Sequence, residues 1–240
     1  MFAIYKRELR SYFITPLGYI FAGMFLAVSG LVFSFLILNA DSSGSYSYEN
    51  ISDYFIVLLF IFSILIPLLT MKLFSEEKKQ RTEQLLMTTP VTLTGVVFAK
   101  YLAALTIFAG TLFVNSFNYI LLFRYGSPNL AVILSNILGL FLIGASFIAV
   151  GLFLSSITEN QLIAAISSMA VVVSLLLISF LANYIETEFF RVVLKWFSVV
   201  DRYSPFTVGY FDIPALIYFV SFSGVFLFLT VRVYEKRRWS

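Results

Sequence analysis

Six long runs of apolar residues divide the chain and constrain its fold more than any other feature. The runs cover residues 17–38, 54–71, 101–123, 130–156, 162–183 and 215–231. About 20 apolar residues in a helix cross the hydrocarbon core of a bilayer, where only helices and closed barrels satisfy every backbone hydrogen bond. The sequence therefore predicts an all-α integral membrane protein, with six transmembrane helices in a single transmembrane domain (1–240) and no soluble domain.

The composition agrees with lipid as the outer solvent. Hydrophobic residues make up 60% of the 240 residues and charged residues 12%, whereas soluble proteins carry about 25% charged residues. The first run has 22 residues, against roughly 7–15 in a signal peptide, so it is predicted to stay in the protein. The chain has no cysteine and no histidine, which excludes disulfides, thiolate metal sites and histidine acid–base chemistry.

The distribution of Lys and Arg predicts the orientation. The N-terminal segment, the loop after the second run and the C-terminal segment hold 12 of the 16 cations. Because short loops rich in Lys and Arg stay on the cytoplasmic side, we expect both termini in the cytoplasm and the protein in the inner (cytoplasmic) membrane. These cations flank the apolar runs, so no basic face is left for nucleic acid.

Two segments outside the runs have the pattern of amphipathic helices. In residues 1–15 apolar side chains recur every three or four positions beside a charged face, and Pro16 ends the pattern. Residues 184–214 also have one apolar and one charged side, over an apolar stretch of about 12 residues that two cations interrupt. This length favours a helix that lies on, or dips into, the outer leaflet over a seventh span.

The predicted spans contain few side chains that could act in catalysis or ion transport. Their centres contain no charged residue, although proton-driven transporters and ion pumps usually need one at membrane depth. The chain has no phosphate-binding G-x-x-x-x-G-K-[ST] loop, and we expect no catalytic site, cofactor or metal in it. The amides of Asn115, Asn118 and Asn136 either line a substrate path or form interhelical hydrogen bonds, and the second interpretation is favoured.

The loop after the second run, residues 72–95, is the most informative segment. Its charges are dense over residues 76–83, Thr82 has the side chain of a helix N-cap, and apolar residues follow at 85–87 before Pro90. The pattern predicts a short amphipathic helix with an apolar patch on the cytosolic side. Such a patch is typical of a docking surface, with anchoring to the membrane interface as the alternative.

The same loop resembles a known family. The string S-E-E-K-K-Q-R-T-E-Q-L-L-M-T-T-P-V at residues 75–91 looks like the E-E-K-x-x-[GR]-T-x-E-x-L-L-x-[TS]-x-P-[VI] segment of ABC-2 type transporter permeases. The opening Y-K-R-E-L-R-S-Y-F at residues 5–13, with P-L-G-Y at 16–19, is similar to the start of the gliding-motility (GldF-like) branch. The resemblance covers essentially the whole chain.

The resemblance implies a half-transporter that pairs with a second copy or a paralogous permease and binds separate ABC ATPase subunits. ATP and Mg²⁺ would be held by those subunits, and an accessory membrane or periplasmic subunit could join them. Residues 1–15 would form an elbow helix, 72–95 would contain a coupling helix, and 184–214 would form outer re-entrant or interfacial helices. The implied ATPase-coupling residues are Glu76, Glu77, Lys78, Arg81, Thr82, Glu83, Leu85 and Leu86.

These patterns bear on three classes of function, and they disfavour the third. The first is the permease subunit of an ABC exporter, for which the low charge and 28 Phe and 14 Tyr favour a hydrophobic or amphipathic substrate. The second is a non-transporting scaffold, a motility or assembly component of an ABC-like complex. The third, an intramembrane enzyme, lacks histidine, cysteine and a charged residue at the centre of any predicted span.

Overall fold

The computed structural model describes residues 1–38, 48–81, 92–125, 129–185 and 187–239. Within these ranges the secondary structure is helical and includes no strand. The elements in chain order are α1 (Phe2–Ile14), α2 (Leu17–Phe33), the π-helix η1 (Ser34–Leu38), α3 (Tyr48–Thr70), α4 (Lys72–Lys79), α6 (Leu93–Asn115), α7 (Phe117–Tyr125), α8 (Leu130–Ile157), α9 (Gln161–Tyr184), α10 (Glu188–Phe197), α11 (Val199–Thr207) and α12 (Ile213–Trp239).

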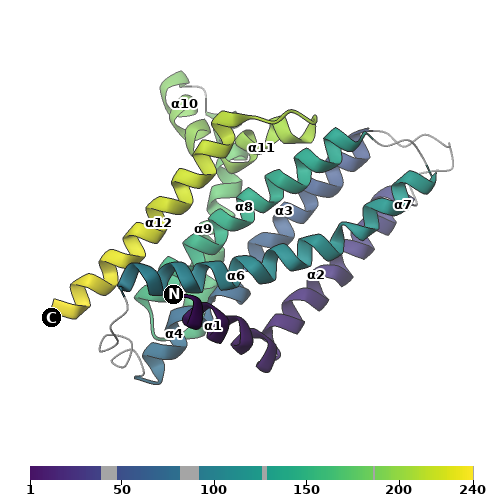
Figure 1. Cartoon of the computed structure of the whole chain (residues 1–240). Helices are drawn as coiled ribbons and strands as arrows, with labels where there is room; N and C mark the ends of the chain where they lie inside the picture. The colour runs from purple at the N-terminus through teal and green to yellow at the C-terminus, as the bar shows by residue number, and fades with distance from the viewer. Residues whose placement is uncertain (39–47, 82–91, 126–128, 186, 240) are drawn as a thin grey trace.

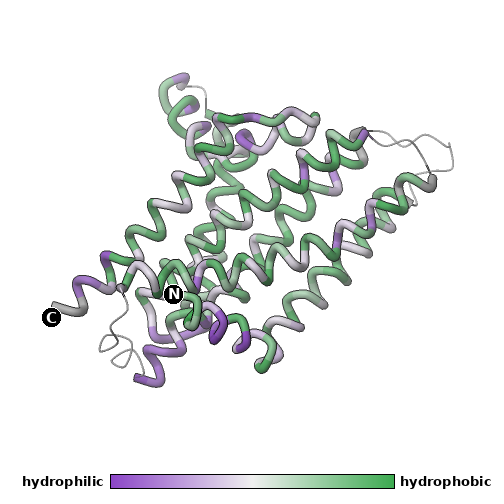
Figure 2. Tube along the Cα trace, viewed as in Figure 1, coloured by the Kyte–Doolittle hydropathy of each residue, from purple (hydrophilic) through white to green (hydrophobic). Residues whose placement is uncertain are grey.

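The described chain contains six helical stretches that are long and apolar enough to cross a membrane, which confirms the predicted fold class. They are Leu17–Ile37, Ile51–Lys79, Leu93–Leu121, Leu130–Ile157, Gln161–Ala182 and Ile213–Lys236. Both termini lie at one end of the bundle together with α1 and α4, whereas α7, α10 and α11 lie at the other (Figure 1). We call these the terminal end and the opposite end. Figure 2 shows apolar residues along the spans and hydrophilic residues on α1, α4 and the end of α12.

The predicted elbow segment forms α1, and proline separates it from the first span. α1 ends at Ile14, Thr15 is extended with φ −85° and ψ 148°, and α2 follows Pro16. A proline ring disfavours helical geometry in the residue before it, so the chain turns here. Tyr12 is the buried residue of α1, and its hydroxyl donates to the Leu69 carbonyl oxygen at 3.0 Å. Burial raises the pKa of this phenol above its ordinary value, so it stays a neutral donor that holds α1 against α3.

The third span begins well before its apolar run. α6 begins at Leu93 because the Thr92 side chain caps it, accepting a hydrogen bond from the Gly95 amide at 3.3 Å. Because the third apolar run starts at residue 101, the charge distribution in the sequence counts Lys100 with the preceding loop, and this assignment is wrong. Lys100 lies inside α6 with 1% of its side chain exposed, at the terminal end of the bundle.

Helix α8 lies at the centre of the bundle and contacts α3, α4, α6, α9, α11 and α12. Two of its glycines allow other helices to approach closely. A Cβ atom on Gly144 would lie 2.1 Å from Phe108 Cζ, and one on Gly151 would lie 2.1 Å from Thr70 Oγ1. Small residues at these positions let helices pack by direct van der Waals contact, which drives helix association in lipid.

The segment at 184–214 folds into two short helices rather than one. The break falls at Ser198, whose side chain caps α11 by accepting from the Asp201 amide at 3.1 Å. Helix α10 has no buried residue and exposes large apolar side chains such as Phe189 and Trp196. Its placement in the outer leaflet remains a prediction.

Candidate functional site

Four charged side chains from three helices meet at the terminal end. Arg7 and Glu8 lie on α1, Glu77 on α4 and Lys100 on α6. Lys100 Nζ is 3.0 Å from Glu77 Oε1 and 3.2 Å from Glu8 Oε1. Arg7 Nη2 is 2.9 Å from Glu8 Oε1 and 3.0 Å from Glu77 Oε1. Each cation therefore bridges the same two carboxylates, and we call this group the ionic cluster.

The four side chains of the ionic cluster differ in their exposure to solvent, from fully buried to mostly exposed. Exposed fractions of the side chains are 1% for Lys100, 13% for Glu8, 17% for Glu77 and 59% for Arg7. Lys100 also donates to the Leu73 carbonyl oxygen at 2.7 Å. The hydrogen bond to Glu8 raises the pKa of Arg7, which keeps its guanidinium charged. A buried charge is tolerated when it is paired and hydrogen-bonded, so the position of Lys100 depends on α1 and α4 being in place.

A serine from α8 holds the beginning of α4. Ser155 Oγ accepts hydrogen bonds from the amides of Phe74 and Ser75, each at 3.1 Å, and donates to the Met71 carbonyl oxygen at 3.1 Å. The first four N–H groups of a helix have no partner within the helix. Ser155 thus acts as a cap supplied by another helix, and it fixes α4 to the terminal end of α8.

A second set of contacts joins α4 to α8 and α12. Lys78 is 5% exposed, and its Nζ donates to the Ser156 carbonyl oxygen and lies 5.9 Å from the centre of the Tyr234 ring. The Phe74 ring lies 4.7 Å from the same tyrosine ring. Helix α4 is therefore tied to α1, α6, α8 and α12 at once.

The implied ATPase-coupling residues occupy different surroundings. Glu77 and Lys78 turn toward the bundle, as described above. Glu76 pairs with Lys72 at 3.1 Å and keeps 31% of its side chain exposed. Arg81 is exposed and has a left-handed backbone (φ 56°) just after α4. Thr82, Glu83, Leu85 and Leu86 lie outside the described residues.

Sequence reasoning missed three members of the ionic cluster. Arg7 and Glu8 were attributed to the charged face of an interfacial helix, and Lys100 to a loop. The available signal was a lysine within one turn of a long apolar run, since a cation there needs either water or a carboxylate. Nothing local in the sequence says which carboxylate it finds.

The predicted polar residue Asn115 lies in a hydrogen-bonded network near the opposite end. Its Oδ1 accepts from Ser29 at 2.8 Å and from Asn118 at 3.0 Å, and its Nδ2 donates to the hydroxyls of Tyr54 (3.3 Å) and Tyr119 (3.0 Å). Asn115 is 0% exposed. These bonds join α2, α3, α6 and α7, which favours an interhelical role over the lining of a path.

Asn136 has a similar arrangement between α8 and α11. Its Nδ2 donates to the Val132 carbonyl oxygen at 2.8 Å, and its Oδ1 accepts from the Tyr203 hydroxyl at 2.6 Å. Gly139 makes room for the tyrosine ring, since a Cβ there would lie 2.7 Å from Tyr203 Cε2. Within the described part of the chain, no group of three or more acidic residues gathers to hold a metal ion.

The fold and this site define a multi-pass, all-helical membrane protein whose helices are joined by ionic and hydrogen-bonded contacts at one end. Residues 46–235 match the sequence model of the ABC-2 family transporter proteins. The chain belongs to this family, whose members are membrane components of transport systems. No curated protein matches the chain. The family match begins after the residues that resemble the gliding-motility branch, so that branch remains a prediction.

Proposed function

We propose that the chain is the permease subunit of an ABC exporter and that α4 transmits the movement of a separate ATPase subunit to the membrane helices. The observation that carries the proposal is the attachment of α4 to four other helices through Ser155, Lys78 and the ionic cluster. Helix α4 also continues the second span directly, within the stretch Ile51–Lys79. A force on the segment after α4 would therefore be passed to the bundle directly, because no loop separates α4 from the second span.

The chemistry of these contacts suits transmission. Breaking a buried ion pair or hydrogen bond costs several kcal/mol of free energy. Helix α4 therefore moves together with its neighbours rather than away from them. Packed interfaces of this kind switch between discrete arrangements and do not deform continuously. In this proposal Glu77 and Lys78 position α4, whereas contact with the ATPase falls to Glu76, Arg81 and the residues after them.

The orientation and substrate follow from the charges. Both termini, with the basic segments around them, would face the cytoplasm, where the ATPase binds ATP and Mg²⁺. In the described spans the Asp, Glu, Lys and Arg side chains lie near helix ends, so the middle of the membrane offers no counter-ion. This favours a hydrophobic or amphipathic substrate. A second permease copy or a paralogous permease would complete the path.

The test is co-purification and ATP hydrolysis after co-expression with a candidate ATPase subunit and reconstitution in lipid nanodiscs. Glu77→Gln is expected to leave the ATPase bound but to remove the stimulation of hydrolysis by substrate. Glu188→Gln is the matched control, because Glu188 lies at the opposite end with 87% of its side chain exposed, and it should behave as wild type.

Three outcomes would count against the proposal. If no ATPase subunit co-purifies, the transmission role of α4 is wrong. If Glu77→Gln and Glu188→Gln keep the same substrate stimulation, the ionic cluster does not transmit. If an ATPase binds and no substrate stimulates it, a scaffold role in an ABC-like complex becomes the better account.

A further inference from the structure

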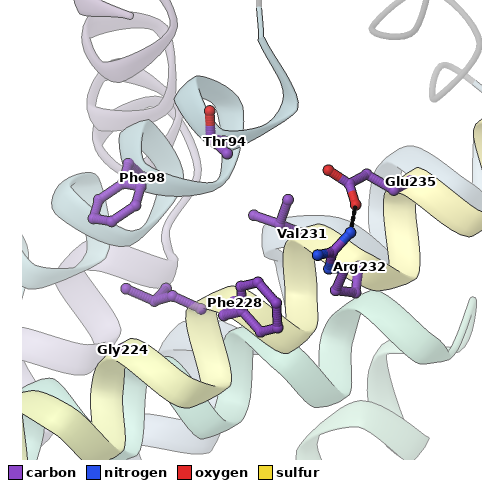
Figure 3. A pocket seen from close by; sticks show the side chains of 8 residues that line it. Thr94, Phe98, Gly224, Phe228, Val231, Arg232 and Glu235 are labelled. Atoms are coloured by element: carbon purple, nitrogen blue, oxygen red, sulfur yellow. Dashed lines mark hydrogen bonds and ion pairs between the residues drawn. The ribbon is translucent and has the colours of Figure 1, made fainter.

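A groove with a volume of about 330 Å³ lies between the beginning of α6 and the end of α12 (Figure 3). Leu227 and Val231 form its floor and are 5% and 6% exposed, while Phe98 and Phe228 flank it with 44% and 55% exposed. The volume falls in the range of small-molecule sites, about 300–1,000 Å³. The groove is therefore large enough for a ligand and almost entirely apolar inside.

The mouth of the groove carries a guanidinium. Arg232 Nη1 pairs with Glu235 Oε2 at 2.8 Å, and its Cζ lies 4.8 Å from the centre of the Phe228 ring. In the sequence, three more cations follow at residues 236–238. With Glu235 counted, residues 232–238 have a formal net charge of +3. Arg232 thus lines one end of the groove, and it begins a segment whose sequence is strongly basic.

The length of the groove along α12 suits the acyl chain of a lipid molecule. It extends along α12 from Glu235 to Gly224, about 16 Å at 1.5 Å per residue. The corresponding candidate span ends at Lys236, so in a membrane Arg232 would lie near headgroup level and the apolar part of the groove at acyl-chain level. A Cβ atom on Gly224 would meet nothing within 4 Å, which leaves the deep end of the groove open.

We propose that this groove binds an acyl chain of an anionic phospholipid, whose phosphate headgroup lies against Arg232. Cations directly beyond a span attract anionic headgroups, and the apolar floor supplies the contact for the chain. A second copy of this protein is a poorer occupant, because a symmetric contact here would bring two segments of charge +3 together. The site is independent of the transmission role proposed above.

The test measures lipid retention by the purified full-length chain. Native mass spectrometry after addition of dioleoyl phosphatidylglycerol or dioleoyl phosphatidylcholine gives the affinity for an anionic and a zwitterionic lipid. Gly224→Leu adds a side chain at the deep end of the groove, where a Cβ meets nothing within 4 Å, and should remove the most tightly held phosphatidylglycerol. Gly110→Leu is the matched control, since a Cβ on this glycine in the second half of α6 also meets nothing within 4 Å, and it should retain lipid as wild type does.

Arg232→Gln separates the headgroup contact from the chain contact. Loss of one cation near the membrane surface should weaken phosphatidylglycerol binding about five-fold and leave phosphatidylcholine binding unchanged. Equal retention of the two lipids by wild type, or unchanged retention in Gly224→Leu, would overturn the proposal. So would a Gly224→Leu variant that changes from dimer to monomer at constant lipid content, because a second copy would then be the occupant.

Discussion

Replacement of Lys100 by methionine removes the buried cation of the ionic cluster and keeps a side chain of similar length. The ammonium of Lys100 contacts Glu8 at 3.2 Å, Glu77 at 3.0 Å and the Leu73 carbonyl oxygen at 2.7 Å. Lys100→Met takes one cation from each carboxylate and one donor from a buried carbonyl. We expect a large loss of stability, because the two carboxylates stay in place with little access to water.

The size of the loss follows from burial. Breaking a buried ion pair by removing one partner costs about 3–5 kcal/mol. The carboxylates keep 13% and 17% exposure and Arg7 still binds both, so the low end, about 3 kcal/mol, applies. Arg7→Gln should cost no more than about 1 kcal/mol, because Arg7 is 59% exposed and solvent screens its pairs.

Thermal unfolding of the purified chain measures the difference. For a chain of this size a loss of 1 kcal/mol lowers Tm by about 2–4 °C, so Lys100→Met should lower it by about 6–12 °C. The double variant Lys100→Met with Glu77→Gln restores neutrality in the cluster. It should be more stable than the sum of the single losses predicts, by about 1–3 kcal/mol.

Two results would refute this reasoning. If Lys100→Met and Arg7→Gln lower Tm equally, burial does not set the strength of the cluster. If the double variant loses the full sum of the two single effects, Lys100 and Glu77 do not interact. Hydrogen exchange gives an independent check, since the amides of α1 should exchange faster in Lys100→Met if the cluster holds this helix.

Ser155→Ala removes the cap of α4 and should cost about 1–3 kcal/mol, with faster hydrogen exchange in α4 and unchanged exchange in α10; equal exchange would exclude the cap. Gly151→Ala should cost about 1–3 kcal/mol by overpacking, seen as a lower Tm. Gly110→Ala, its control, should keep or raise Tm, and a similar loss in both variants would point to helix propensity rather than contact. Tyr203→Phe leaves Asn136 Oδ1 without its 2.6 Å donor and should cost about 1–3 kcal/mol in thermal unfolding; an unchanged Tm would mean this bond contributes nothing.

The positions of the six candidate spans could be predicted from the sequence because hydropathy is a local property. Each span needs about 20 apolar residues wherever it packs, so the six runs correspond to α2, α3, α6, α8, α9 and α12 without knowledge of their neighbours. The turn at Pro16 is equally local. The same reasoning rejected a seventh span in residues 184–214, where the structure has two short helices.

The ends of the spans were harder to predict because tertiary partners extend them. The apolar run of the third span starts at residue 101, yet α6 begins at Leu93, after the Thr92 cap. The helix can include Lys100 because its ammonium pairs with carboxylates on two other helices. The charged residues 76–79 were likewise assigned to a loop, although Glu77 and Lys78 turn into the bundle. A prediction from neighbouring residues places a charged side chain in water, whereas the folded chain places a side chain of opposite charge beside it.

What the sequence alone determined is therefore the number of membrane-spanning helices and the presence of amphipathic segments, because both depend on side chains a few positions apart. Only the tertiary structure decided that Glu8 and Lys100, 92 positions apart in the chain, share one cluster, that Ser155 caps α4, and that Gly224 opens a groove toward Phe98. These contacts join distant segments, and their free energy depends on burial and distance, which no local pattern of residue types specifies.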